Sequence, residues 1–189
     1  MISVLSFYLG RVPYNYAWNL QKSIVGILKS VDSPSVHCIL LLEHDPVYTI
    51  GIRHTDPMND YGEIGIKRLR NLGAEFVSTD RGGLITYHGP GQLVAYPIIN
   101  LRCKSLRGRG LRWYVGALEE AGIQLCSQFG VTATAGGDSE TGVWLDSTHK
   151  VMAIVRYPSK LFNNISWNSY KLYYRATVMA QTNNTLWFS

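Results

Sequence analysis

Residues 81–92 combine four glycines with polar side chains around a short strand-like core. Arg81 offers a permanent cation, and Tyr87 and His88 offer hydrogen bonds to a ligand. The glycines allow the backbone to approach a bound group closely, and Pro90, set between two of them, imposes a sharp turn directly after His88. The segment therefore predicts a rigid polar cradle for a ligand. The alternative is an ordinary β-hairpin whose turn is rich in glycine.

Three widely spaced cysteines form neither a metal-binding pattern nor an even-numbered disulfide framework, which indicates a reducing compartment. Cys38 begins an apolar run and Cys126 lies in an expected helix, so both are expected in the core. Cys103 is flanked by Arg102 and Lys104, and nearby cations stabilise a thiolate. Cys103 is therefore the candidate for a reactive thiol.

Apolar spacing along the chain predicts the elements that must position these residues. Helical periodicity favours three helices and apolar, β-branched runs favour several strands, which indicates an α+β fold rather than regular βαβ alternation. The expected helices are 14–31, 60–72 and 113–129, and the expected strands are 1–9, 36–43, 47–50, 74–77, 84–88, 93–99, 142–145 and 151–155. The last two strands form a hairpin with its turn at 146–149.

At 189 residues the chain fits one domain around a single core. Hydrophobic residues make up 46% of the sequence, which argues against disorder, and no apolar run approaches the roughly 18 residues of a membrane span. Neither a secretory signal nor an import presequence is visible at the N-terminus. The one change in composition that could mark a domain boundary follows Val155.

A basic cluster contributes much of the net charge of +5. Its members are Arg102, Lys104, Arg107, Arg109 and Arg112. Such a cluster either steers an acidic protein partner or is simply a solvated loop, and both interpretations stay open. Nucleic-acid binding is the weaker alternative, because the cluster lacks interleaved aromatic residues and no recognition motif is present.

Three sequence blocks together resemble the lipoyl(octanoyl) transferase family. The blocks are Leu42-Glu43-His44-Asp45-Pro46-Val47-Tyr48-Thr49-Ile50-Gly51, residues 81–92, and Thr141-Gly142-Val143-Trp144-Leu145-Asp146 followed by Lys150-Val151-Met152-Ala153-Ile154. They occur in the family's order, and the similarity runs from about Leu9 to Ile154. The resemblance implies an α+β fold in which helices flank a mixed β-sheet, like the catalytic module of biotin and lipoate protein ligases.

The resemblance also implies roles for individual residues. It makes Lys150 the catalytic lysine, which activates a nucleophilic cysteine and shuttles protons; taken alone, a lysine after a hairpin turn is usually a solvated charge. Val155 stands where the family has a glycine, so its side chain is expected to narrow the pocket. Trp144 is expected in the core. The implied substrate pocket comprises Arg81, Gly82, Gly83, Leu84, Ile85, Thr86, Tyr87, His88, Ala153, Ile154 and Val155.

The family's later sequence blocks do not occur here. After Ile154, family members continue with a glycine, a His-Gly-x-Ala-Leu-Asn block and a Pro-Cys-Gly block that holds the acyl-accepting cysteine, and this chain has none of the three. We therefore predict an incomplete acyltransferase module at 1–155 and a divergent tail of unknown structure at 156–189.

For function, the resemblance implies transfer of an octanoyl group from acyl carrier protein to a lysine of lipoyl domains. These domains belong to the 2-oxoacid dehydrogenase complexes and the glycine cleavage H protein. The resemblance implies no cofactor or metal, no nucleic-acid or membrane partner, and a mitochondrial location. Two alternatives stay open. One is a catalytically silent isoform that binds acyl groups or carrier protein. The other is an ATP-dependent lipoate or biotin ligase, although the Gly89-Pro90-Gly91-Gln92 continuation favours the transferase.

Overall fold

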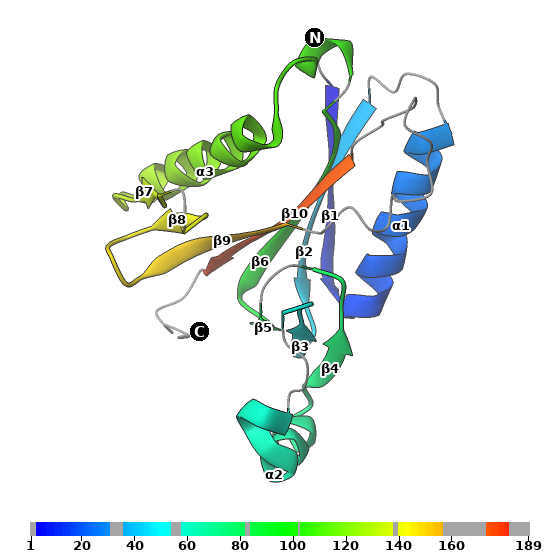
Figure 1. Ribbon diagram of the computed structural model, residues 1–189, viewed down its shortest axis with the longest axis vertical. Coiled ribbons are helices and arrows are strands. Elements are labelled where there is room, and N and C mark those ends of the chain that lie inside the picture. The colour runs from blue at the N-terminus through cyan, green and yellow to red at the C-terminus, as the bar shows by residue number, and fades with distance from the viewer. Residues whose placement is uncertain are drawn as a thin grey trace.

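The computed structural model describes residues 3–30, 36–53, 58–81, 84–101, 103–137, 140–156 and 173–181. Within these residues a seven-stranded sheet has the order β1-β2-β6-β10-β9-β8-β7, and a three-stranded sheet has the order β4-β3-β5 (Figure 1). The strands are β1 (Ser3–Val12), β2 (Val36–His44), β3 (Val47–Ile50), β4 (Glu75–Ser78), β5 (Ile85–His88), β6 (Gln92–Asn100), β7 (Thr134–Ala135), β8 (Val143–Trp144), β9 (Lys150–Arg156) and β10 (Tyr173–Gln181). The helices are α1 (Tyr14–Ser30), α2 (Met58–Asn71), α3 (Leu111–Gln128) and the short 3-10 helix η1 (Lys104–Leu106).

The helix α1 covers one face of the large sheet over β1, β2 and β6. Its apolar residues recur every three or four positions, from Ala17 through Ile24 to Leu28, so they form one stripe toward the sheet. Alternate residues of the strands pack against this stripe, because successive side chains of a strand point to opposite faces. The buried strand residues of this core are Cys38, Leu40, Leu42, Val94, Tyr96 and Ile98.

The helix α3 lies on the opposite face of the same sheet. Ile154 of β9 pairs with position 178 of β10, which pairs in turn with Ala95, so Ile154 and Ala95 share a face. That face is the one turned away from Val94, because successive strand residues alternate. Ile154 and Met152 are buried in a cluster with residues of α3. The two long helices therefore sandwich the large sheet.

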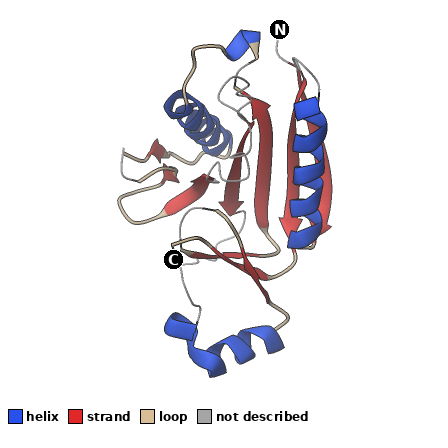
Figure 2. Cartoon of the chain, turned by 45° about the vertical axis from the view of Figure 1, so that its right-hand side comes forward, coloured by secondary structure: helices blue, strands red, loops and turns tan. Residues whose placement is uncertain are grey.

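The small sheet stands beyond one end of the large sheet and carries α2 at its outer side (Figure 2). Aromatic rings fill the space between them: Tyr48 lies 5.1 Å from Phe76, 5.1 Å from Tyr87 and 6.0 Å from Tyr61 of α2, measured between ring centroids. α2 is kinked at Gly62, whose φ of 61° is open to glycine at little cost. No helix among the described residues is long and apolar enough to cross a membrane.

The α+β class and most expected elements are confirmed, including the hairpin of β8 and β9. Some features differ from the prediction. The strands divide between two sheets, and β10, within the segment expected to be a divergent tail, lies between β6 and β9. Pairing with strands far away in the sequence leaves no local signal, and strand propensity depends on such context. β7 and η1 were also not expected. The domain boundary after Val155 stays a prediction.

Candidate functional site

The small sheet turns two sets of side chains in opposite directions. Its register pairs Thr49 with Thr86 and Tyr48 with Tyr87. Because side chains alternate along a strand, Thr86 and His88 share the face of Thr49, whereas Tyr87 joins the aromatic rings near α2. Thr49 and His88 are buried against the body of the protein. The expected cradle is therefore divided between two faces of one strand.

Arg81 is buried beneath this sheet and is held by Thr49. Its Nε donates a hydrogen bond to Thr49 Oγ1 at 3.0 Å, and its Nη2 donates to the Thr49 carbonyl oxygen at 2.6 Å. The Thr49 hydroxyl donates to the Thr86 carbonyl oxygen at 3.2 Å, so it offers only lone pairs to Arg81 and to His88 Nε2, 3.4 Å away. His88 accordingly carries its proton on Nε2. Its buried Nδ1 has no hydrogen-bond partner among the described residues.

His44, at the end of β2, is held in one tautomer. Its Nδ1 lies 3.1 Å from the Val12 carbonyl oxygen, which can only accept, so Nδ1 carries the proton. Its Nε2 then accepts a hydrogen bond from the Tyr96 hydroxyl at 2.8 Å. The His44 ring also lies 5.2 Å from the ring of Tyr14 and 5.7 Å, edge-on, from that of His88. We call Tyr14, His44, His88 and Tyr96 the histidine junction.

Both imidazoles of the histidine junction are uncharged near neutral pH. Burial, with the nearby His44 and Arg81, lowers the pKa of His88 to about 3. Burial also lowers the pKa of His44, although the hydrogen bond to Val12 and the charge of Asp45 oppose it. The junction can therefore exchange hydrogen bonds with a ligand, but it offers no charge from its histidines.

The expected turn after His88 is confirmed. The Gln92 N–H donates to the Gly89 carbonyl oxygen at 3.2 Å, and Gly91 has a φ of 84°. The Gly91 N–H donates to Glu43 Oε2 at 2.9 Å, which ties the turn to the end of β2. Two of the sequence blocks thus meet in space. Gly82 and Gly83 lie outside the described residues.

Lys150 begins β9, directly after the expected turn of the hairpin. Its Nζ lies 4.3 Å from the centroid of the Trp144 ring and donates a hydrogen bond to the Thr141 carbonyl oxygen at 3.2 Å. The turn is closed by Asp146 Oδ1, which accepts backbone N–H bonds from Thr148 and His149, both at 2.8 Å. These bonds and the His149 ring hold the pKa of Asp146 well below its usual value. Trp144 is half-buried beneath Lys150 rather than part of the core.

A β-bulge decides which way Lys150 points. Val143 pairs with Met152, but Trp144 pairs with Lys150, so Lys150 and Val151 together oppose one residue of β8. With regular pairing, Lys150 would share the face of Met152 and point toward α3. The extra residue places it on the face of Trp144 instead. We call Thr141, Gly142, Trp144 and Lys150 the lysine hairpin.

Ala153, Ile154 and Val155, the part of the implied substrate pocket that lies on β9, are also divided between the two faces of the large sheet. Ile154 is buried against α3, whereas Ala153 pairs through β10 with Val94 and so shares the α1 side with Tyr96. Val155 follows Ala153 by two positions and lies on that same side. Lys150 lies there as well, because Trp144 points away from the buried Val143. The α1 side thus carries Lys150, Ala153, Val155 and the histidine junction. β5 and the hairpin of β8 and β9 nevertheless stand apart from each other along this side (Figure 1).

The remaining expected site residues are spread out. Ile85 pairs with Ile50 and lies on the side of Tyr87, and Leu84 is exposed. Thr49, His44, Tyr96 and Tyr14 were not singled out from the sequence as site residues. A usable signal existed for His44, because it continues the alternate buried positions of Leu40 and Leu42 with a polar ring.

The cysteines are all at least partly buried. Cys38 is buried as expected, and Cys126 is partly buried against the α3 cluster. Cys103, the candidate for a reactive thiol, is buried among Leu101, Leu106 and Tyr114. A buried structural thiol of this kind is usually inert. Among the described residues, no group of three or more His, Cys, Asp and Glu side chains could hold a metal ion.

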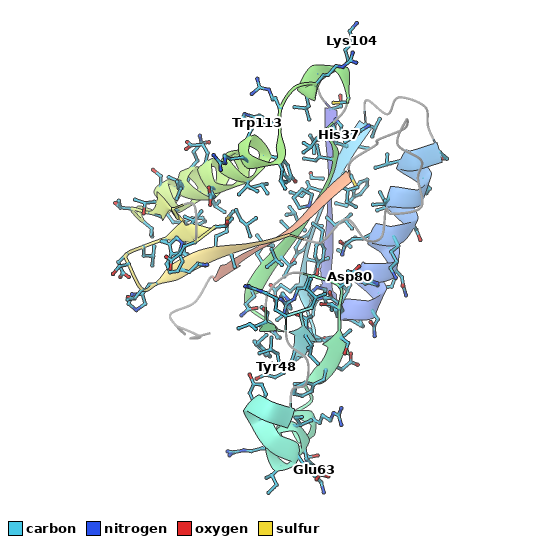
Figure 3. All side chains as sticks on the ribbon, in the orientation of Figure 1. His37, Tyr48, Glu63, Asp80, Lys104 and Trp113 are labelled. Atoms are coloured by element: carbon cyan, nitrogen blue, oxygen red, sulfur yellow. The ribbon has the colours of Figure 1, made fainter. Side chains whose placement is uncertain are left out.

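The basic cluster lies far from the histidine junction. Lys104 marks one end of the molecule, whereas Tyr48 of the small sheet lies in the other half (Figure 3). β6 connects the two regions with nine residues, so its ends are about 26 Å apart. Lys104, Arg107, Arg109 and Arg112 are exposed there, and Arg109 covers the Trp113 ring at 4.4 Å. Arg102 is outside the described residues.

Comparisons with known proteins agree on one family. Residues 13–160 match the model of the lipoyl protein ligase A/B catalytic domain. The chain is 44% identical over 154 residues to the octanoyl-[acyl-carrier-protein]:protein N-octanoyltransferase of Danio rerio, covering 80% of this chain and 63% of that protein. It is 43% identical over 137 residues to a mitochondrial octanoyltransferase of Arabidopsis thaliana, covering 72% of this chain and 55% of that protein. The chain thus spans less than two thirds of these relatives.

Solved structures agree in fold. A bi-partite lipoate protein ligase from Thermoplasma acidophilum superposes with a TM-score of 0.65 at 16% identity, covering 98% of this chain and 63% of that one. The LipL1 protein of P. falciparum in complex with lipoate gives a TM-score of 0.64 at 13% identity, covering 96% of this chain and 48% of that one. With the match to residues 13–160, these findings show that the chain belongs to the lipoyl protein ligase A/B catalytic domain family.

Proposed function

We propose that the protein transfers an octanoyl group from acyl carrier protein to a lysine of lipoyl domains. Two relatives that are named octanoyl-[acyl-carrier-protein]:protein N-octanoyltransferases are 44% and 46% identical to the chain. The observation that carries the proposal is the shared face of the large sheet. The bulge at Val151 turns Lys150 to the side of Ala153, Val155 and the histidine junction.

The reaction asks for chemistry that these residues can supply in part. A cysteine thiolate attacks the thioester carbonyl, and the C–S bond to acyl carrier protein breaks as the carrier thiol leaves with a proton. The nitrogen of the target lysine then attacks the new cysteine thioester, and the cysteine thiol is released as the amide forms. Lys150, exposed to solvent, can pass protons between the nucleophile and the leaving thiolate. The neutral His88, with an unused buried lone pair on Nδ1, can accept a hydrogen bond from an N–H group of a substrate.

The attacking thiol is the part that the described cysteines do not offer. Cys38 and Cys103 are buried, and Cys126, on α3, is partly buried against the cluster that contains Val143 and Met152. We therefore expect the acyl-accepting thiol to come from a block like the family's Pro-Cys-Gly, which these 189 residues do not contain. These 189 residues by themselves are then expected to bind the octanoyl group without forming a thioester, and transfer is expected when such a block is supplied.

A matched pair of proteins tests the proposal. One is the 189-residue chain, and the other is an extended chain in which residues 1–155 continue into the corresponding segment of the Danio rerio relative. Each is mixed with octanoyl-acyl carrier protein and an unmodified lipoyl domain, and octanoylation is followed by intact-mass spectrometry. We expect the extended chain to octanoylate the domain without ATP. A folded but inactive extended chain would overturn the proposal, and a strict need for ATP would favour the ligase alternative.

The silent isoform is a second candidate, favoured by two observations. All three cysteines are at least partly buried, and Val155 places a β-branched side chain on the face that carries Lys150. In this case the 189-residue chain binds octanoyl-acyl carrier protein but never carries a hydroxylamine-sensitive octanoyl adduct. Such an adduct on the 189-residue chain would exclude the silent isoform and assign the thiol to one of its three cysteines.

We further propose a mitochondrial location and lipoyl-domain partners. The animal relatives are named as mitochondrial, whereas others are chloroplastic or bacterial. A structural neighbour was studied together with its E2 lipoyl domain. Co-localisation of the fluorescently tagged protein with a mitochondrial marker, and transfer to a lipoyl domain rather than to a non-lipoyl control domain, test the two statements.

A further inference from the structure

One peptide unit, between Thr141 and Gly142, joins α3 to Lys150. The N–H of this peptide, on Gly142, donates a hydrogen bond to Glu119 Oε1 at 2.8 Å. The carbonyl oxygen of the same peptide, on Thr141, accepts a hydrogen bond from Lys150 Nζ at 3.2 Å. A carboxylate and an ammonium group thus lie at the two ends of one amide.

The surrounding structure leaves this peptide little freedom. Gly142 has a φ of 133°, and a Cβ at this position would come within 2.5 Å of the Met152 carbonyl oxygen. In α3, Gly122 lets the helix approach the hairpin, because a Cβ there would lie 2.5 Å from Met152 Sδ and 2.9 Å from Val143 Cγ2. Gly122 lies three residues after Glu119, so both share the helix face that meets the hairpin.

The adjacent acid provides a contrast within the same helix. Glu120 is exposed, and its Oε1 accepts a hydrogen bond from Gln124 Nε2 at 2.9 Å, four residues along the same helix. Glu119 is half-buried and reaches across to the peptide of another element. Only the first of these bonds stays within the helix. Glu119 is therefore the acid that connects α3 to the lysine hairpin.

We propose that Glu119 is a positioning residue for Lys150 and acts through the Thr141–Gly142 peptide. A carboxylate that accepts from the N–H polarises the amide and increases the negative charge on its carbonyl oxygen. That oxygen then holds the ammonium group of Lys150 more strongly, above the Trp144 ring. The bulge determines the face on which Lys150 lies, and Glu119 holds the Nζ atom of Lys150 at one place on that face. This inference rests on the proposed function, in which Lys150 is catalytic.

Competitive labelling of the folded 189-residue chain tests the connection without any turnover. Limiting acetic anhydride is added, and the acetylation rate of each lysine is measured by peptide mass spectrometry, with the exposed Lys104 as internal reference. We expect Lys150 to react faster in Glu119→Ala, by about fivefold at most, the factor that corresponds to complete loss of its hydrogen bond to Thr141. Glu119→Gln keeps an acceptor oxygen, but a neutral one, so its labelling rate should lie between those of the wild type and Glu119→Ala. Glu120→Ala is the matched control and should leave Lys150 unchanged.

A second measurement keeps the inference falsifiable if Glu119→Ala folds poorly. In Glu119→Gln the acceptor is neutral and weaker, so the amide proton resonance of Gly142 should move upfield, while amides elsewhere in the hairpin turn stay in place. An unchanged Gly142 resonance, or equal Lys150 labelling in the wild type and folded Glu119→Ala, would overturn the inference.

A different experiment tests the proposed function. Lys150→Met in the extended chain should abolish octanoyl transfer if Lys150 is catalytic. Full transfer by that variant would remove Lys150 from the mechanism, while the labelling result would still report whether Glu119 holds it. Conversely, unchanged labelling in Glu119→Ala together with loss of transfer in Lys150→Met would reject Glu119 as positioning residue and leave the proposed function intact.

Discussion

The histidine junction and the lysine hairpin lie on the same side of the large sheet, yet they are built in opposite ways. His88 and His44 are 3% and 0% exposed, surrounded by rings from α1, β2, β5 and β6. Lys150 is exposed and is held by a backbone carbonyl oxygen and the face of one indole. One region is defined by burial, and the other by a few directed contacts at the surface.

The difference follows from the charge of each group. Burial in a medium of low polarity favours the neutral form of imidazole, so the histidines of the junction offer hydrogen bonds but no charge. An ammonium group would be costly to bury without a partner, and at the surface it can exchange protons with water. The α1 side of the sheet therefore presents a neutral buried acceptor at one place and an exposed cation at another.

The largest expected effect is on stability at the histidine junction. His44→Ala should lower the free energy of unfolding by about 3 kcal/mol, because it leaves a cavity and removes the acceptor of the Tyr96 hydroxyl. Lys150→Ala, the counterpart in the lysine hairpin, should cost less than about 1 kcal/mol. Urea denaturation measures both. Similar losses for the two variants would contradict the comparison.

A glycine in the lysine hairpin should give the next largest effect. Gly142→Ala places a Cβ against the Met152 carbonyl oxygen at a backbone angle that side chains rarely adopt, so we expect a loss of about 1–3 kcal/mol. Gly137→Ala is the control, because nothing lies within 4 Å of a Cβ there. Thermal unfolding of both variants gives the answer. If they melt together, the hairpin is less constrained than its geometry indicates.

Acid should weaken the junction through His88. The pKa of His88 is about 3 in the folded protein against 6.5 for an ordinary histidine, so between these values the unfolded chain binds more protons. This contribution to stability is complete above pH 6.5 and is lost as the pH falls toward 3, by at most about 1.4 kcal/mol per pH unit. His88→Asn should flatten the curve in this window. Titration of Asp146 and the other acids is common to both proteins, so parallel curves would refute the assignment.

The smallest of these effects should come from a single hydrogen bond. Tyr96→Phe removes the donor to His44 Nε2 and should cost about 1 kcal/mol of unfolding free energy. Tyr16→Phe serves as the control, because Tyr16 is exposed on α1 and should change stability by less than about 0.5 kcal/mol. Chemical denaturation measures both variants, and an unchanged dependence of the unfolding free energy on denaturant concentration would show that only the stability differs. A neutral Tyr96→Phe would mean that another group holds His44.

Much of the fold was accessible from the sequence because its signals are local. The apolar stripe of α1, the leucine-rich run of β2 and the glycine turn after His88 each depend on residues that are neighbours along the chain. The same holds for the hairpin, whose turn at 146–149 is closed by Asp146 itself. Strands that pair with partners far away in the sequence could not be predicted from local patterns, and β10 is the clearest example.

The candidate site shows the same division. Arg81, His88 and Lys150 were identified by sequence blocks, but the roles of His44, Thr49 and Glu119 depend on contacts between 23 and 52 residues apart. Cys103 shows the limit of a local signal: its flanking cations raised the possibility of a reactive thiol, and the structure buries the residue in a cluster with Tyr114. The residues adjacent to a cysteine in the sequence do not by themselves determine the surroundings of its thiol in the folded protein.

By itself, the sequence determined the α+β class, the positions of most elements and the candidate acyltransferase residues, because periodicity, turn chemistry and motif blocks are properties of consecutive residues. Only the tertiary structure decided which of those residues share a face. The register between β8 and β9 includes one extra residue, and that bulge turns Lys150 away from α3 toward the side of Ala153 and Tyr96. A shift of one position reverses every side chain of a strand, and no local pattern encodes it, since register is set by the partner strand and the packing around it.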